Sequence, residues 1–161
     1  MKLEEYKNKC LETWGCGNET IRTKIGIEEE FGELSGKVKR WFRGDYNTDY
    51  NKFKEDLIGE IGDCLYYVTM GYHYFCKPQD IELLDSGIPE VSQGFLYEIW
   101  ETLMNNKRYY LGQKHYISLI RCIIAFANQC GFSIDEVINY NIQKLQDRKN
   151  RGVIKGDGDN R

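Results

Sequence analysis

Four acidic residues in two short blocks are spaced so that they could hold a divalent cation. Glu30 and Glu33 lie in the segment IEEEFGEL, and Glu60 and Asp63 lie in GEIGDCL, each pair being three residues apart. On an α-helix this spacing stacks both carboxylates on one face. Two such helices folded back on each other would bring all four together, and their repulsion is costly unless a cation lies among them. The sequence therefore predicts a divalent-metal enzyme whose substrate carries phosphates.

The two acidic pairs also share a phase relative to the apolar residues of their segments. With each residue advancing about 100°, Glu33 lies at about 300° from Glu30, and Asp63 lies at about the same angle from Glu60. In both segments the acids therefore occupy the same flank of the apolar stripe and are expected to face one cleft. The alternative is an ordinary solvated face, where Glu33 and Lys37 form a pair worth a few tenths of a kcal/mol.

The ligand types favour magnesium over iron. Mg²⁺ takes oxygen ligands, keeps several waters and shares phosphate oxygens with its substrate, and Mn²⁺ is the expected substitute. A di-iron oxidase would also use carboxylates in a helical bundle, but it requires Glu-x-x-His motifs. Met70 precedes His73 by three residues and Gly112 precedes His115 by three, so the di-iron alternative fails.

Apolar residues recur at helical spacing along most of the chain, with turn residues between the segments. Gly131 is expected to cap one helix, and Ser133 with Glu136 forms a capping box that opens the last one. No stretch alternates as a strand would. The sequence predicts an all-α fold, a helical bundle of about five to six helices. The expected helices cover 1–14, 20–43, 50–76, about 91–108, 115–130 and 134 to about 149.

A single domain is expected to span all 161 residues, a length sufficient to bury a core. The net charge of −3 argues against a nucleic-acid partner, because binders of the phosphate backbone usually present a basic surface. No apolar run reaches the length of a membrane span, and the N-terminus lacks the apolar core of a signal peptide. We therefore expect a cytoplasmic protein with neither a membrane nor a nucleic-acid partner.

The six cysteines are expected to be reduced thiols that pack as small apolar residues. They lie mostly inside helical, apolar segments, and the chain contains no Cys-x-x-Cys motif. With only two histidines in the sequence, a structural zinc site is not expected.

The acidic blocks resemble the EExxE…ExxD signature of the MazG-like family of all-α nucleoside triphosphate pyrophosphohydrolases. The first block is EEFGE at 29–33, and EIGD at 60–63 follows after 26 intervening residues. The late segment NIQKLQDR at 141–148 resembles the Asn-x-x-Lys-Leu…Arg end of bacterial and phage members. The resemblance covers about residues 20–76 and 115–161, which is most of the chain.

The resemblance implies hydrolysis between the α and β phosphates of a (deoxy)nucleoside triphosphate, which yields the monophosphate and pyrophosphate. Mg²⁺ held by the four carboxylates would neutralise phosphate oxygens and lower the pKa of a bound water. Glu29, the first acid of the signature, would be the general base or a further ligand, unless it is a surface acid. The implied metal ligands are Glu30, Glu33, Glu60 and Asp63.

The resemblance also implies contacts with the substrate. Asn141 and Lys144 match the late motif and would hold phosphate or sugar, with Arg148 one turn further along the same face. Lys37 could also meet the phosphates. The alternative for these residues is a salt bridge on a helix surface. Three aromatic residues are candidates to stack on a base, although such residues usually belong to the core: Trp41, Tyr67 and Trp100.

Members of the family assemble bundles from two or more chains, so a homodimer or homotetramer is expected in a bacterial cell or a phage-infected host. The segment at about 78–114, with its own helix, exceeds the compact family core, and the tail at about 150–161 is expected to be irregular. Base preference is therefore not implied. Two other functions stay open. One is phosphoribosyl-ATP pyrophosphohydrolase, and the other is a non-catalytic helical module that binds nucleotides or a protein.

Overall fold

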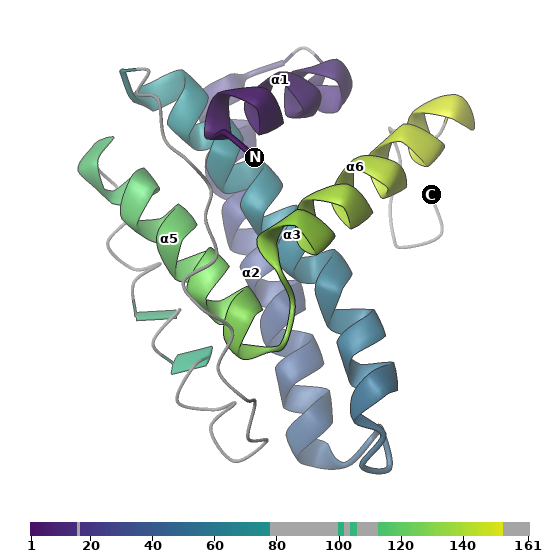
Figure 1. The fold of residues 1–161 in the computed structure, drawn as a ribbon. Coiled ribbons are helices and arrows are strands. Elements are labelled where there is room, and N and C mark those ends of the chain that lie inside the picture. Colours follow the sequence, from purple (N-terminus) through teal and green to yellow (C-terminus); the bar gives the residue numbers. More distant parts are fainter. Residues whose placement is uncertain (16, 78–99, 102–103, 106–112, 153–161) are drawn as a thin grey trace.

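The protein is all-α. The computed structural model describes residues 1–15, 17–77, 100–101, 104–105 and 113–152, without the side chains of 113–115 (Figure 1). These residues form five helices packed as a bundle, and no strand occurs among them, which confirms the predicted fold class. The helices are α1 (Leu3–Trp14), α2 (Glu19–Arg43), α3 (Tyr50–Phe75), α5 (Gln113–Gln129) and α6 (Ile134–Asn150).

The two long helices α2 and α3 run antiparallel, joined by a short turn (Figure 1). Gly44 ends α2 in the left-handed conformation, with φ 86°, and its N–H donates to the carbonyls of Arg40 and Trp41. Asp49 opens α3 by accepting a hydrogen bond from the N–H of Lys52. Because both ends are capped, the chain reverses within a few residues and the acidic segments of the two helices face each other.

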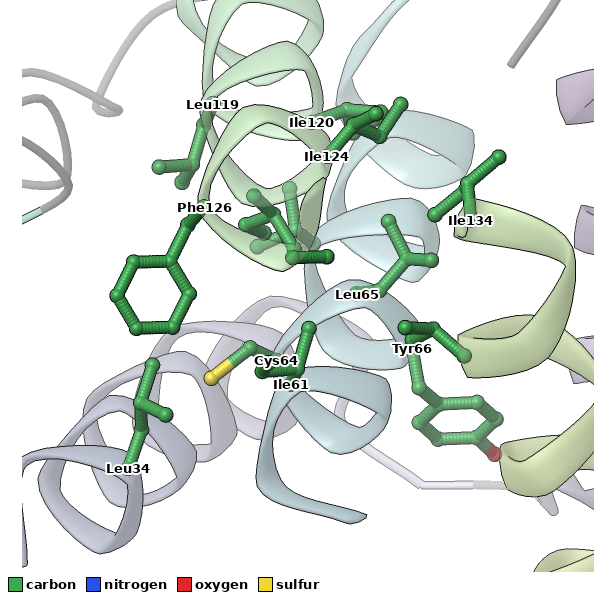
Figure 2. Close-up of a cluster of buried hydrophobic side chains, with 14 of the residues drawn as sticks. Leu34, Ile61, Cys64, Leu65, Tyr66, Leu119, Ile120, Ile124, Phe126 and Ile134 are labelled. Atoms are coloured by element: carbon green, nitrogen blue, oxygen red, sulfur yellow. The ribbon is translucent and has the colours of Figure 1, made fainter. Parts of the chain in front are cut away.

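α3 is the central helix, since it packs against each of the other four. In Figure 2 side chains from α2, α3, α5 and α6 point into one apolar cluster. Full burial of such a side chain contributes roughly 1.5–3 kcal/mol to stability. The labelled members of this cluster are Leu34, Ile61, Cys64, Leu65, Tyr66, Leu119, Ile120, Ile124, Phe126 and Ile134.

Two glycines let helices approach each other closely beside the acidic segments. A Cβ atom on Gly26 of α2 would lie 2.1 Å from Cε1 of Tyr67, and one on Gly62 of α3 would lie 2.9 Å from Cβ of Asn141. Contacts this short do not occur between real side chains, so a larger residue at either position would force its neighbour to shift. Gly62 therefore allows α6 to reach the acidic segment of α3.

The predicted bounds of these five helices are confirmed to within two residues at each end. Gly131 closes α5 with φ 79°, and the N–H of Phe132 donates to the carbonyl of Ala127. The capping box is also present, since Ser133 Oγ accepts from the N–H of Glu136 while the Glu136 carboxylate accepts from the N–H of Ser133.

Some expectations fall partly on residues outside the described ranges. Of the helix expected over about 91–108, residues 100, 101, 104 and 105 are helical, and the rest is not described. The tail is described only to residue 152. None of the five described cysteines takes part in a disulfide. Cys10, Cys64 and Cys130 are buried, and Cys76 and Cys122 are half-buried.

No single described helix is long and apolar enough to cross a membrane. The segments Tyr116–Gln129 and Ile134–Asn150 pass that test of length and composition only when taken together, and they are bent by 102° at the break between them.

Candidate metal centre

Three carboxylates from two helices meet in a buried cluster between α2 and α3. Glu30 comes from α2, and Glu60 and Asp63 come from α3. One oxygen atom of each lies within 4.8 Å of the others. The three residues are only 7%, 5% and 8% exposed. Converging carboxylate oxygens are the ligands that a hard divalent ion prefers, so the three residues could hold one after a small closure of the cluster.

The surroundings of the carboxylate cluster (Glu30, Glu60 and Asp63) disfavour negative charge. Burial raises the pKa of Glu30 to about 8, and the charges of Asp63 and of neighbouring glutamates add to this effect. Burial also raises the pKa of Glu60, although the ammonium of Lys37 opposes the shift. Desolvation and like charges both penalise the ionised form, whereas a bound divalent cation would stabilise it.

One oxygen of Glu60 has no hydrogen-bond partner. Its Oε2 atom is buried and unsatisfied among the described residues, while Oε1 lies 3.2 Å from Nζ of Lys37. A buried polar atom without a partner is uncommon in folded proteins, and a bound ion or an ordered water would satisfy it. The cluster therefore fits a cation by two independent observations, the convergence of three carboxylates and this unpartnered oxygen.

Two lysines reach the carboxylate cluster from the helices on either side of α3. Lys37 of α2 pairs with Glu60, and Nζ of Lys144 of α6 lies 2.5 Å from Oδ2 of Asp63. Their side chains are 13% and 22% exposed. Each lysine thus pairs with one of the two carboxylates that α3 contributes. Both lysines were predicted to contact substrate, and the structure places both at the cluster.

A hydrogen-bonded chain behind Asp63 fixes that carboxylate. Nδ2 of Asn141 donates to Oδ1 of Asp63 at 2.8 Å, and the hydroxyl of Tyr6 in α1 donates to Oδ1 of Asn141 at 3.1 Å. Asn141 and Tyr6 are both fully buried. Asn141, predicted to bind phosphate or sugar, thus contacts a carboxylate of the cluster. Tyr6 was not predicted as a site residue, because nothing in the sequence distinguishes it from the other residues of the apolar stripe of the first helix.

The remaining predicted residues lie around the carboxylate cluster. Glu33 and Glu29 are exposed on α2, and Glu33 is not among the three acids whose oxygens converge. It is nevertheless close, because its charge contributes to the raised pKa of both Glu30 and Glu60. The charge of Glu29 likewise acts on Glu30. Arg148 is half-buried on α6, one turn beyond the lysine that pairs with Asp63.

Of the three aromatic candidates, Tyr67 lies nearest to the acids. Burial raises the pKa of its hydroxyl, and the charges of Glu30 and Glu29 raise it further. Trp41 instead belongs to an aromatic cluster, with its ring centroid 4.9 Å from that of Phe53. Nε1 of Trp100 donates a hydrogen bond to the Ser35 hydroxyl at 3.3 Å.

The chain is similar to the Gene 37 protein of Mycobacterium phage L5. The two are 25% identical over 137 residues, which cover 85% of this chain and 72% of the phage protein. The name of that protein states no activity. No protein-family model matches the chain, and no solved structure matches it. The function must therefore be argued from the carboxylate cluster itself.

Proposed function

We propose that this protein is a Mg²⁺-dependent hydrolase of (deoxy)nucleoside triphosphates, which cleaves between the α and β phosphates to give the monophosphate and pyrophosphate. One observation carries the proposal: Glu30, Glu60 and Asp63 are buried, yet their oxygens converge within 4.8 Å. These residues also match the acidic signature that the sequence shares with the MazG-like pyrophosphohydrolases. A purely structural bundle gains nothing from three desolvated acids at one place.

The residues around the carboxylate cluster have distinct roles in this proposal. Bound there, Mg²⁺ would neutralise phosphate oxygens and make water a better nucleophile. Lys37 and Lys144 would donate hydrogen bonds to the phosphates, because their ammonium groups lie at the cluster. Glu29 is exposed beside Glu30 and would accept the proton of the attacking water at its carboxylate.

Assembly and location belong to the same proposal. We propose a homodimer or homotetramer acting in the cytoplasm of a bacterial cell or a phage-infected host. The similarity to a protein of Mycobacterium phage L5 supports the second of these settings. Sedimentation of the purified protein measures the oligomeric state directly, and a monomer at micromolar concentration would contradict the proposed homo-oligomer.

The test is to incubate the protein with Mg²⁺ and a panel of ribo- and deoxynucleoside triphosphates together with phosphoribosyl-ATP. Pyrophosphate release from a nucleoside triphosphate is the expected result. Release of orthophosphate with a diphosphate product would mean a different phosphatase chemistry, and turnover of phosphoribosyl-ATP alone would assign that activity instead. Absence of turnover, with a melting temperature unchanged by Mg²⁺ and nucleotide, would identify a non-catalytic module.

A further inference from the structure

Lys37 and Lys144 hold carboxylate oxygens that a bound cation would need. Oδ2 of Asp63 pairs with Nζ of Lys144, and Oδ1 of the same carboxylate accepts from Asn141. Both oxygens of Asp63 are therefore engaged. In Glu60, Oε1 pairs with Lys37 and only Oε2 has no partner among the described residues. A cation that takes Asp63 as a ligand would lie close to the Lys144 ammonium, because both would contact the same carboxylate.

We propose that the two lysines exchange partners when a divalent cation binds. They leave the carboxylates of Asp63 and Glu60 and move to the phosphates of the substrate. This exchange couples the binding of the cation to the binding of phosphate. The inference rests on the proposed function and adds a regulation of the same site. In this scheme each lysine contacts a carboxylate before the cation binds and a phosphate afterwards, and so links the two ligands.

Electrostatic repulsion drives the first half of the exchange. An ammonium group is a donor only and cannot be a metal ligand. A divalent ion within about 4 Å of a unit positive charge repels it by several kcal/mol at the dielectric of a partly buried site. The lysine side chains are 13% and 22% exposed, so both reach solvent, and their flexible stems allow the ammonium groups to change position.

The charge balance drives the second half. With all three carboxylates ionised around a bound divalent cation, the charges of the carboxylates, the two ammonium groups and the cation sum to +1. The excess positive charge is then carried by the two displaced lysines, which lie on α2 and α6 at either side of the acids. Triphosphate is a polyanion and binds such a site more tightly after the cation than before it. By thermodynamic reciprocity, the phosphates must tighten cation binding by the same factor.

Replacement of the competing lysine tests the exchange. In Lys144→Met the cation no longer displaces an ammonium from Asp63, so Mn²⁺ alone should bind about tenfold more tightly than to the wild type. The preformed complex of Mn²⁺ with inorganic tripolyphosphate should bind at least about tenfold more weakly, because a phosphate contact is lost. Electron paramagnetic resonance of free Mn²⁺ measures the first affinity, and titration calorimetry measures the second.

Lys37→Met should also bind Mn²⁺ alone more tightly and the complex of Mn²⁺ with tripolyphosphate more weakly. This second variant keeps the test independent of any folding defect in Lys144→Met. Lys39→Met is the matched control, since Lys39 is exposed on the same helix and its loss removes the same charge. Both affinities of this control should equal those of the wild type within about twofold. Circular dichroism verifies that each variant keeps its helices.

The outcomes separate the exchange from the proposed function. The exchange is wrong, and the metal site stands, if the wild type binds Mn²⁺ but neither lysine variant binds it more tightly. The same conclusion follows if the affinities for Mn²⁺ alone and for its tripolyphosphate complex change in the same direction. If the wild type does not bind Mn²⁺ at all, the proposed function fails and the exchange fails with it.

Discussion

α3 has two buried sides that hold different chemistry. The side facing α5 buries Ile61 and Leu65 in an apolar cluster (Figure 2). The side facing α2 and α6 buries Glu60 and Asp63, which are only 5% and 8% exposed. Burial stabilises the fold on the first side and opposes it on the second, where carboxylates lose their hydration. Under the proposed function, the acidic side is retained for binding at the expense of stability.

Glu60→Ala should produce the largest loss of activity, and it should leave the apolar side of α3 intact. Removal of one of three converging ligands is expected to lower pyrophosphate release from a nucleoside triphosphate below a few per cent of the wild-type rate, while far-UV circular dichroism stays nearly unchanged. Glu28→Ala is the control, because Glu28 is an exposed acid of α2 and should keep full activity. Substantial turnover in Glu60→Ala would exclude Glu60 as an essential ligand.

Leu65→Ala should break the apolar side instead. Leu65 is fully buried in the apolar cluster, and truncation of such a leucine costs about 2–5 kcal/mol of unfolding free energy. Urea denaturation measures this loss. Saturating Mg²⁺ should stabilise the variant and the wild type by equal amounts, because the cavity does not involve the acids. A loss of unfolding free energy under about 1 kcal/mol would show that the apolar side of α3 tolerates truncation. The contrast between the apolar and the acidic side would then not hold.

The acidic side should also make stability depend on pH. The pKa of Glu30 is raised from its ordinary value of 4.5 to about 8 in the folded protein. The folded state therefore holds more protons than the unfolded state between these values, and the unfolding free energy contributed by Glu30 falls as pH rises from about 5 to about 8.

Urea denaturation in EDTA, compared between the wild type and Glu30→Gln, isolates this contribution from other titrating groups. Glu30→Gln should be the more stable of the two at pH 8, by up to a few kcal/mol, and the difference should narrow at pH 5. Added Mg²⁺ should remove most of the fall in the unfolding free energy of the wild type between pH 5 and pH 8. A difference between the proteins that does not change with pH would rule out the shifted pKa.

Tyr6→Phe should have the smallest effect. It removes the hydroxyl that donates to Asn141, which costs about 1 kcal/mol and loosens Asp63, so turnover should fall a few-fold. Tyr46→Phe is the matched control, because the Tyr46 hydroxyl donates to Asp56 at 2.9 Å and the Tyr46 side chain is also buried. Both variants should lose similar stability in urea, but only Tyr6→Phe should lose activity. Equal turnover in Tyr6→Phe and Tyr46→Phe would mean that the hydrogen bonds from Tyr6 to Asn141 and from Asn141 to Asp63 do not help to position the Asp63 carboxylate.

The sequence predicted the helices well because each one carries its own local signals. Apolar periodicity marked their lengths, and residues such as Gly131 and Ser133 marked their ends. The convergence of Glu30 with Glu60 and Asp63 also followed from local information, since equal spacing and equal phase on two antiparallel helices place the acids together.

The rest of the site depends on contacts between distant segments. Tyr6 and Asn141 are 135 residues apart in the chain, and no local pattern records that pair. Lys37 is spaced to pair with Glu33 on one helix, yet its ammonium lies against Glu60 of α3. Glu33 has the same phase as Asp63 but stays exposed. Asp63 is buried because Gly62 admits α6 beside it, a tertiary contact that spacing along one helix does not predict.

The direct measurement of the central claim is a Mn²⁺ titration of the wild type and of Glu30→Gln, with Glu28→Gln as control. If the carboxylates of α2 and α3 hold a divalent cation together, the wild type and the control will bind Mn²⁺ with equal affinity, and Glu30→Gln will bind it at least about tenfold more weakly. If the wild type does not bind Mn²⁺ at millimolar concentration, or if Glu30→Gln binds it as the wild type does, the metal centre described for this protein does not exist.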